Sequence, residues 1–358
     1  MKFSCVDGFS GAGGLSLGLS RAGFEILLSF DNDKLCIETQ QSNPSYFKHQ
    51  TRCCGIDDML GGHLLTETGL QPGELDLLAG GPPCQGFSVQ RIGADIDDRN
   101  DLVLKFVQLV DEVRPKFFLM ENVRGLAGKR GREYLARVLK HAEESGYHVH
   151  LKVLDAQGYG VPQRRQRVVV VGEHTPEGEK PYFAFPKPTT PEGERVTVRT
   201  AIGKLPAPPQ DGTDHPDFTH HRRDRLSALN KKRLAALKEG QGREHLPPEL
   251  LADCHRINPD IIGHRSVYGR MRWDDVAPTI TARFDSFTRG LFGHPSQLRS
   301  ISLREGAELQ TFPSDIVFSG NKVDIARQIG NAVPVRLAES IGKSIAKCLR
   351  ARRSREQS

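Results

Sequence analysis

The first half of the chain alternates short apolar runs with amphipathic stretches, and this alternation limits the possible folds more than any other feature. Six apolar runs occur within residues 1–172, at 3–6, 25–30, 75–79, 116–120, 148–154 and 168–171. Strands that alternate with helical segments are typical of βαβ units. The sequence therefore predicts an α/β domain built on a doubly wound, mostly parallel sheet.

Two helices are expected at specific places. Residues 102–113 carry seven apolar side chains at helical spacing, with Asn100 or Asp101 as the cap and Pro115 just past the end. A second amphipathic stretch, residues 333–349, precedes a basic tail at residues 351–358. Both stretches are expected to be helical.

Composition changes after residue 173, which indicates a second domain. Twelve of the 22 prolines lie between residues 174 and 260, and proline is excluded from central strands. Residues 222–243 hold eight basic and two acidic side chains, and residues 264–304 interleave seven arginines with five aromatic residues. Both segments suit a phosphate backbone, although charge runs are usually solvated faces and arginine–aromatic packing is common on ordinary surfaces.

Composition also excludes several classes of protein. Charged residues are 26% and hydrophobic residues 37% of the 358 residues, with a net charge of +6, which excludes disordered, collagenous and coiled-coil chains. No apolar stretch approaches the ~18 residues of a membrane span, and glycines interrupt the N-terminal segment before a signal-peptide core could form. The seven cysteines include no CxxC pair, so neither a disulfide framework nor a metal site is expected. We expect a cytosolic protein.

A glycine-rich loop, residues 7–19, follows the first expected strand and opens a helix. Glycines let a ligand approach the backbone, and helix N-terminal amides point at it. Ser16 stands where the third glycine of a GxGxxG pattern should be, which disfavours a nicotinamide cofactor. Asp31 lies about 20 residues beyond the loop and could accept both ribose hydroxyls of a nucleoside. S-adenosylmethionine is the common nucleoside of this kind, although such a loop can also be a purely structural turn.

Cys84 follows the expected strand 75–79 in the segment GGPPCQGFS, residues 80–88. Two prolines stiffen this loop and glycines leave room around it. The thiol is therefore expected to be exposed at the C-terminal edge of the sheet, where open α/β sheets bind ligands. Structural cysteines are typically buried in apolar runs, so this context favours a nucleophile.

Two further groups are expected at the same edge. Glu121 follows the apolar run 116–120, where a lone glutamate would usually be a helix cap. Arg165 and Arg167 lead into the run 168–171, and arginines that enter a buried strand are costly without anionic partners. A phosphate, a carboxylate or a developing anion would satisfy them.

Six ordered motifs resemble those of the cytosine-5 DNA methyltransferase family. They are DGFSGAGGLSLGL, GGPPCQGFS, MENV, the run Gln163, Arg165 and Arg167, LREGAELQTFP and GNAVP. The resemblance spans residues 3 to about 345, except for roughly 174–264. It implies the Rossmann-like fold of S-adenosylmethionine-dependent methyltransferases. A catalytic domain at 1–173 would be followed by a smaller target-recognition domain at 174–300, a return to the catalytic domain at 301–350 and the tail at 351–358.

The resemblance implies covalent catalysis. Carbon 5 of cytosine is a weak nucleophile, so the thiolate of Cys84 is expected to add to carbon 6. Glu121 would hold or share a proton at ring nitrogen 3, and loss of the carbon 5 proton with expulsion of Cys84 would yield 5-methylcytosine. Arg165 is expected near the base, where its charge would favour the thiolate. Arg167 would support it, or hold Glu121 or the loop.

The resemblance also implies a pocket for S-adenosylmethionine and no metal. The pocket residues are expected to be Phe9, Gly11, Gly13, Asp31, Asn32, Ile56, Pro82, Leu102, Asn331 and Val333. The chain departs from the family twice: Gly8 replaces a bulky apolar residue, and Gly55 precedes Ile56 where an Asp-Ile pair is typical. Either Asp57 or Asp58 substitutes for that aspartate, or the adenine amino group lacks this partner.

Double-stranded DNA is the implied partner. A thiol cannot reach carbon 6 inside the base stack, so the target cytosine must be flipped out. The segment 174–300 lies where the family keeps its target-recognition domain, which makes the basic window a phosphate-tracking surface. DNA contacts are expected from Gln85, Ser88, Arg222, Arg223, Lys231, Lys232, Arg270, Arg272 and Thr279.

Two alternatives share this fold: a methyltransferase acting on a tRNA cytosine, and an inactive DNA-binding regulator. The loop GGPPCQGFS and the long middle segment favour DNA over tRNA, and the intact Cys84 and Glu121 disfavour an inactive protein. We expect a monomeric, stand-alone enzyme of bacterial or phage type, associated with the nucleoid. A restriction endonuclease would be a functional partner rather than a physical one. The recognised DNA sequence does not follow from the chain.

Overall fold

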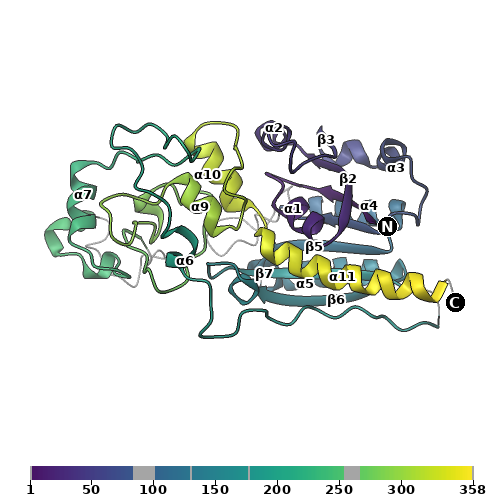
Figure 1. The fold of residues 1–358 in the computed structure, drawn as a ribbon. Helices are drawn as coiled ribbons and strands as arrows, with labels where there is room; N and C mark the ends of the chain where they lie inside the picture. Colours follow the sequence, from purple (N-terminus) through teal and green to yellow (C-terminus); the bar gives the residue numbers. More distant parts are fainter. Residues whose placement is uncertain (1, 84–100, 130, 176–177, 254–266, 357–358) are drawn as a thin grey trace. The chain divides into compact units, whose positions relative to one another are not determined.

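The computed structural model describes residues 2–83, 101–129, 131–175, 178–253 and 267–356. The chain divides into two compact units (Figure 1). The first unit contains residues 1–159, 166–188 and 333–358, and the second contains residues 160–165 and 189–332. These limits differ from those of the predicted domains, because residues 174–188 belong to the first unit and residues 301–332 to the second.

The first unit is built on a seven-stranded sheet with the order β3-β2-β1-β4-β5-β7-β6. β7 runs antiparallel to both of its neighbours, and the other neighbouring pairs are parallel. This confirms the prediction of a mostly parallel sheet. The strands are β1 Phe3–Gly8, β2 Phe24–Asp31, β3 Gln50–Cys53, β4 Leu77–Gly80, β5 Phe117–Val123, β6 Tyr147–Asp155 and β7 Gln166–His174.

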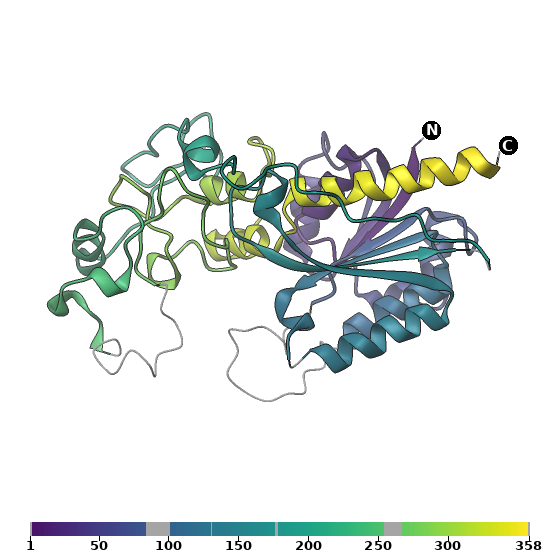
Figure 2. The same cartoon turned by 90° about the horizontal axis from the view of Figure 1, so that it is seen from below.

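Helices cover both faces of this sheet, as expected for a doubly wound fold. α4 and α5 lie on one face and α11 lies on the other (Figure 2). α1 packs against α11, and this close approach requires Gly18, because a Cβ there would lie 2.4 Å from the Cβ of Ala338. The helices of the first unit are α1 Gly14–Arg21, α2 Lys34–Gln41, α3 His63–Thr68, α4 Asp101–Val113, α5 Arg132–Glu144 and α11 Val335–Glu356, with 3-10 turns at Ile56–Met59, Arg124–Ala127 and Ala156–Tyr159.

The helix predicted at residues 333–349 is longer than expected and includes most of the predicted basic tail. The guanidinium of Arg352 donates to the carbonyl of His174 at 2.9 Å. Arg353 pairs with Asp76 at 3.0 Å, and its guanidinium lies 4.2 Å from the ring centre of Phe3. The arginines of α11 therefore dock onto the first unit.

The second unit has little regular structure. It contains the helices α6 Val198–Ile202, α7 Ala228–Ala235, α9 Leu303–Leu309 and α10 Lys322–Asn331, with 3-10 turns at Arg243–His245, Pro248–Leu250 and Phe287–Arg289. Its described residues form isolated β-bridges rather than strands. Buried charges stabilise it: Arg299 and Glu305, each 1% exposed, pair at 2.6 Å.

Neither unit shows a membrane segment or a metal centre in the part of the chain that the structure describes. None of the described helices combines the length and apolar character needed to cross a bilayer. Among the same residues, no group of three His, Cys, Asp or Glu side chains is placed to hold a metal ion.

Candidate active site

The carboxyl ends of four parallel strands meet at one edge of the sheet in the first unit. Gly8 of β1 lies opposite Phe30 of β2 and Gly80 of β4, and Gly80 lies opposite Met120 of β5. The residues that follow these positions are the glycine-rich loop, Asp31, the loop leading to Cys84, and Glu121. The strand register thus brings the predicted cofactor and catalytic segments to a single edge.

The glycine-rich loop adopts left-handed backbone conformations that leave room for a ligand. Gly11 and Gly13 have φ values of 53° and 82°, and Phe9 has 55°. Among the described residues, no atom lies within 4 Å of the position that a Cβ on Gly11 would take. Gly13 precedes α1 without a side-chain cap, and the backbone of Ser16 in the first turn of this helix is hydrogen-bonded to the Asp7 carboxyl.

Asp31 ties this loop to the end of β2. Its Oδ2 accepts the N–H of Gly11 and its Oδ1 accepts the N–H of Asp33, both at 2.8 Å. A carboxylate oxygen can accept more than one hydrogen bond. Asp31 is therefore fixed beside Gly11 by two backbone hydrogen bonds.

The other predicted cofactor residues differ in exposure. Asn32 is exposed, Leu102 is half-buried, and Ile56, Pro82 and Val333 are buried. The carbonyl of Pro82 accepts a hydrogen bond from the side-chain amide of Asn122 at 2.9 Å, which fixes the loop just before Cys84. All of these residues belong to the first unit; Asn331 belongs to the second.

The structure shows what surrounds the two positions, Gly8 and Gly55, at which the chain departs from the family. A Cβ on Gly8 would lie 2.7 Å from the ring of Phe30, so this buried ring fills the space of the missing side chain. Asp57 pairs with Lys105 at 2.8 Å. Asp58 accepts the N–H of Gly55 at 2.8 Å, in the first turn of its own helix. Both carboxylates thus have partners within the fold, and a role of either one beside adenine stays a prediction.

Glu121 and Arg167 form an ion pair across β5 and β7. Arg167 is the register partner of Val123, so Glu121 is its diagonal neighbour on the same face of the sheet. The Nε of Arg167 lies 2.8 Å from Oε1 of Glu121, and the two side chains are 13% and 11% exposed. The pair places a guanidinium against the Glu121 carboxyl at the edge of the sheet, although Oε1 of Glu121 accepts no hydrogen bond from the described residues.

Arg165 is a buried arginine that bonds to backbone carbonyls. It belongs to the second unit and is 1% exposed. Its guanidinium donates to the carbonyls of Ile280, Gly330 and Ala332 at 2.8–2.9 Å. These contacts hold Arg165 within the second unit, while Arg167 contacts the predicted acid Glu121. The position of Arg165 beside the base stays a prediction.

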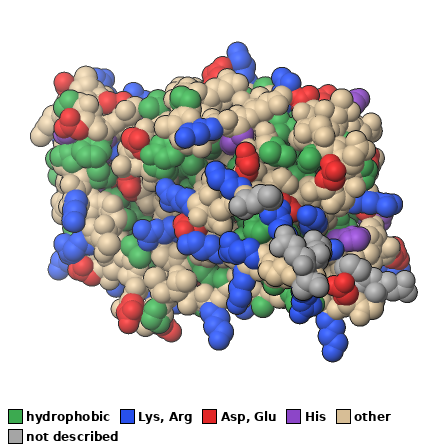
Figure 3. Space-filling view, turned by 45° about the vertical axis from the view of Figure 1, so that its right-hand side comes forward, with side chains coloured by type: hydrophobic (Ala, Val, Ile, Leu, Met, Phe, Trp, Pro, Cys, Tyr) green, Lys and Arg blue, Asp and Glu red, His purple; other side chains and the backbone are tan. Residues whose placement is uncertain are grey.

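Some predicted DNA contacts have exposed side chains and others do not. Arg222, Lys231, Lys232 and Arg272 are exposed, and Figure 3 shows a face on which Lys and Arg side chains gather. Arg270 is 6% exposed and donates to the carbonyls of Leu234, Leu237, His294 and Gln297, so its guanidinium is not available to DNA.

Two other predicted contacts have intramolecular partners. Thr279 donates to the carbonyl of Arg164 at 2.5 Å, and Arg223 donates to the side chain of Gln210 at 3.1 Å. Cys84, Gln85 and Ser88 lie outside the described residues.

A buried polar network, which was not predicted from the sequence, fixes the glycine-rich loop. Gln40 of α2 is fully buried; its amide donates to the hydroxyl of Ser10 at 2.9 Å and to the carbonyl of Gly11 at 2.8 Å. Its Oε1 accepts from the hydroxyl of Ser29 at 2.7 Å. Gly11 is thus bonded at both of its backbone groups: its N–H donates to Asp31, and its carbonyl accepts from Gln40. A polar residue at a buried helix position was the signal that could have revealed this network.

Asp7, at the end of β1, is a second buried polar residue without a predicted role. It is fully buried, and its Oδ2 accepts from the hydroxyl of Ser16 at 2.5 Å. Burial raises the pKa of the Asp7 carboxyl to about 7, although the hydrogen bond from Ser16 opposes this shift. Asp7 therefore couples the end of β1 to the first helix through a carboxyl group that titrates near neutral pH.

Comparison with known proteins places this geometry in a family. The family model of C-5 cytosine-specific DNA methylases matches residues 3–347. The Type II methylase M.HgiDII of Herpetosiphon aurantiacus is 36% identical over 363 residues, covering 100% of this chain and 99% of that protein. The Type II methyltransferase M1.HphI of Haemophilus parahaemolyticus is 34% identical, covering 97% and 87%.

A solved structure is similar to this protein over nearly the whole chain. It is described as a DNA modification methyltransferase encoded within an E. coli prophage; it covers 98% of this chain and 100% of its own, with a TM-score of 0.74 and 25% identity. The sheet order and this likeness identify the fold of S-adenosylmethionine-dependent methyltransferases. The chain belongs to the family of C-5 cytosine-specific DNA methylases, the methyltransferases that modify cytosine in DNA at carbon 5.

Proposed function

We propose that this enzyme methylates carbon 5 of one cytosine within a specific sequence of double-stranded DNA, by flipping the base and adding Cys84 to carbon 6. The observation that carries this proposal is the ion pair between Glu121 and Arg167 at the edge of the sheet. β5, which holds Glu121, is hydrogen-bonded to β4, and the chain after β4 leads through Pro83 to Cys84. A carboxyl group held beside a nucleophilic loop suits activation of a pyrimidine ring.

The residues at this edge fit S-adenosylmethionine. Asp31 would bind the ribose, the open backbone at Gly11 would accept the methionine part, and Ile56 and Leu102 would pack against the adenine. Pro82, Asn331 and Val333 would complete the pocket. When bound, S-adenosylmethionine supplies an electrophilic methyl group.

The protein side chains would supply the remaining chemistry. The Cys84 sulfur forms a bond to carbon 6, and the electron pair of the 5,6 double bond moves toward ring nitrogen 3, where Glu121 donates a proton. Arg167 keeps the other oxygen of Glu121 in place. After carbon 5 has gained the methyl group, a base removes its proton and the returning electrons expel the Cys84 thiolate. Glu121 takes back the proton from ring nitrogen 3, which yields neutral 5-methylcytosine. Such addition requires a flipped base, because the stack hides carbon 6.

The names of the relatives support a role in restriction and modification. M.HgiDII and M1.HphI are both named as Type II enzymes, and their similarity over nearly the whole chain favours DNA over tRNA as the substrate. We propose that the protein works as a monomer on cytoplasmic, nucleoid DNA. A matching restriction endonuclease would recognise the same DNA sequence without binding to the methyltransferase itself. The predicted target-recognition segment 174–300 would lie on the second unit, except for residues 174–188.

Bisulfite sequencing tests this function. DNA from cells expressing the wild type should carry 5-methylcytosine at one recurring sequence, and DNA from cells expressing Cys84→Ser should carry none. Absence of modified cytosine from the wild-type sample, at protein levels equal to those of the variant, would contradict the proposal.

A further inference from the structure

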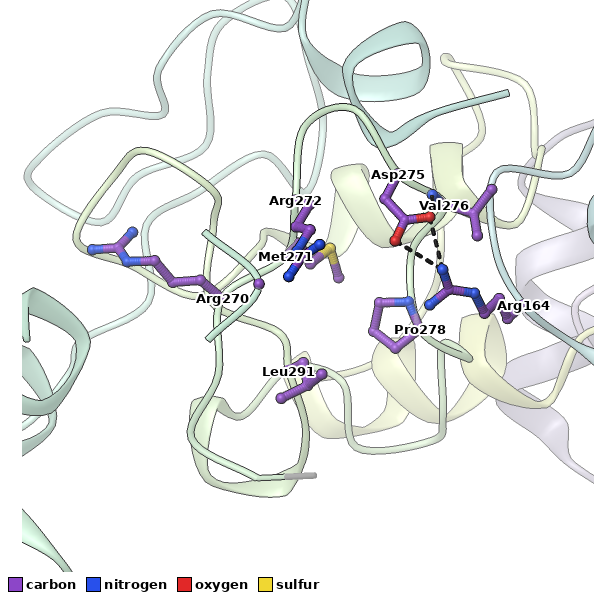
Figure 4. A pocket seen from close by; sticks show the side chains of 9 residues that line it. Arg164, Arg270, Met271, Arg272, Asp275, Val276, Pro278 and Leu291 are labelled. Carbon is purple, nitrogen blue, oxygen red and sulfur yellow. Dashed lines mark hydrogen bonds and ion pairs between the residues drawn. The ribbon is translucent and has the colours of Figure 1, made fainter. Parts of the chain in front are cut away.

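A hollow of about 350 Å³ lies within the second unit and is lined by arginines and apolar side chains (Figure 4). Its lining residues are Arg164, Gly240, Arg270, Met271, Arg272, Asp275, Val276, Pro278 and Leu291. Met271 and Val276 are buried, and Pro278 and Leu291 are half-buried. The hollow thus combines apolar surface with three guanidinium groups.

Two of the three arginines are already paired within the protein. One nitrogen of Arg164 lies 2.8 Å from both carboxylate oxygens of Asp275, as the dashed lines in Figure 4 show. Arg270 points away from the other labelled side chains and bonds to backbone carbonyls. In the part of the chain that the structure describes, the guanidinium of Arg272 has neither a hydrogen bond nor an ion pair. Arg272 is therefore the arginine of this hollow that can bind a ligand.

The backbone on both sides of Arg272 is fixed. Met271 donates to the carbonyl of Gly293 at 3.0 Å, and the N–H of Trp273 donates to the Glu239 carboxylate at 3.1 Å. The side chain lies against Gly240, where a Cβ would be 1.8 Å from its Nε. A rigid backbone and a close glycine limit the directions in which the guanidinium can point, which suits a recognition residue.

The surroundings favour a base edge over a phosphate. The Asp275 carboxylate already occupies Arg164, and the apolar side chains of the lining offer a phosphate no further donors. A guanine presents two acceptors, O6 and N7, which match two donors of one guanidinium. Adenine presents a donor at the position of O6 and would leave one arginine donor without an acceptor.

We propose that Arg272 determines sequence specificity by donating two hydrogen bonds to O6 and N7 of a guanine in the major groove of the recognised DNA. This inference rests on the proposed function only for the identity of the substrate as duplex DNA. Arg272 reads the sequence, while the exposed Lys231 and Lys232 of α7 contact phosphates.

A binding selection on randomised duplexes tests this assignment without requiring methyl transfer. Wild type, Arg272→Lys and Lys232→Ala would each be incubated with the library and S-adenosylhomocysteine, and bound duplexes would be sequenced. Arg272→Lys keeps the charge but loses the planar fork of donors. It should reduce the preference for guanine at one position of the site, or at that position and its symmetry mate, by roughly 5- to 150-fold, and leave other positions unchanged.

The matched control distinguishes recognition of a base from a general effect of positive charge on DNA binding. Lys232→Ala should weaken binding to all sequences alike and lower the salt slope of log affinity by about 1. Gly240→Ala, which pushes the guanidinium aside without removing its charge, should reproduce the effect of Arg272→Lys. Thermal melting of each variant confirms that it is folded.

Specific results would overturn the assignment. They are an unchanged preference at every position in Arg272→Lys and Arg272→Ala, an even weakening across all sequences, or a wild type without sequence preference. Mass spectrometry of 5-methylcytosine made by the wild type tests the proposed function separately. A wild type that binds selectively but makes no 5-methylcytosine would contradict the proposed function and leave the assignment of Arg272 standing.

Discussion

Arg165 and Arg167 are two residues apart, yet the structure gives them different surroundings. Arg167 contacts Glu121, and Arg165 donates to three backbone carbonyls of the second unit. Two arginines before a strand are equivalent in sequence, because nothing in the chain shows which one faces a carboxylate. The pairing of Val123 with Arg167 decides the question.

Substitution should separate these two roles. Arg167→Ala frees the carboxyl group of Glu121 and should slow methyl transfer by at least ~100-fold, the range of a lost general acid. Arg165→Ala removes a donor from three buried carbonyls, of which Ala332 keeps a bond from Gln310. It should lower the free energy of unfolding by roughly 3 kcal/mol. Single-turnover kinetics and urea unfolding of both variants would show this contrast; equal effects on both quantities would contradict it.

The Asp7 carboxyl should make folding stability depend on pH. Its folded-state pKa of about 7 lies above the ordinary value of 3.8, so the folded state binds more protons than the unfolded state between these values. Its contribution to stability is present at low pH and is lost as pH rises through about 7. Relative to Asp7→Asn, the wild type should lose roughly 3 kcal/mol between pH 5 and pH 8. Urea unfolding at both pH values measures this difference; a constant difference would mean that the burial of Asp7 does not shift its titration.

Among the elements, the long buried strands and the helix α4 could be predicted from the sequence because apolar periodicity defines them. β3 could not, because its residues Gln50–Cys53 are exposed or half-buried and include no apolar run. The second unit also resisted prediction, since its chain is held by side chains such as Arg270 and Arg304 that bond to distant carbonyls. Such pairings have no local sequence signal.

The C-terminal helix α11 also exceeded its predicted length, because arginines that suggested a free basic tail bind the first unit instead. Arg353→Ala removes the ion pair with Asp76 and the contact with the Phe3 ring. It should lower the unfolding free energy by about 1–2 kcal/mol. Arg350→Ala, which changes an exposed side chain of the same helix, serves as the control and should change it by less than about 0.5 kcal/mol. Similar effects of the two variants, measured by urea unfolding, would argue against docking of the helix end.

At the scale of the whole molecule, the distribution of charge indicates how the protein binds DNA better than the net charge of +6 does. The exposed Arg222, Lys231 and Lys232 are expected to neutralise phosphates, whereas Arg233 and Arg243 of the same basic window are buried. Log affinity for duplex DNA should fall linearly with log salt concentration, with a slope of about −0.9 for each phosphate contacted. Fluorescence anisotropy over a range of salt concentrations measures this slope, and a flat response would exclude a phosphate-tracking surface.

The account as a whole depends on a covalent bond between Cys84 and a cytosine. Incorporation of 5-fluorocytosine at the target position tests this bond directly, because fluorine cannot leave as the carbon 5 proton does. With the recognised duplex and S-adenosylmethionine present, denaturing gel electrophoresis and peptide mass spectrometry should show a protein–DNA adduct at Cys84, absent from Cys84→Ser. A wild-type protein that methylates normal DNA but never becomes trapped on the fluorinated duplex would contradict the account.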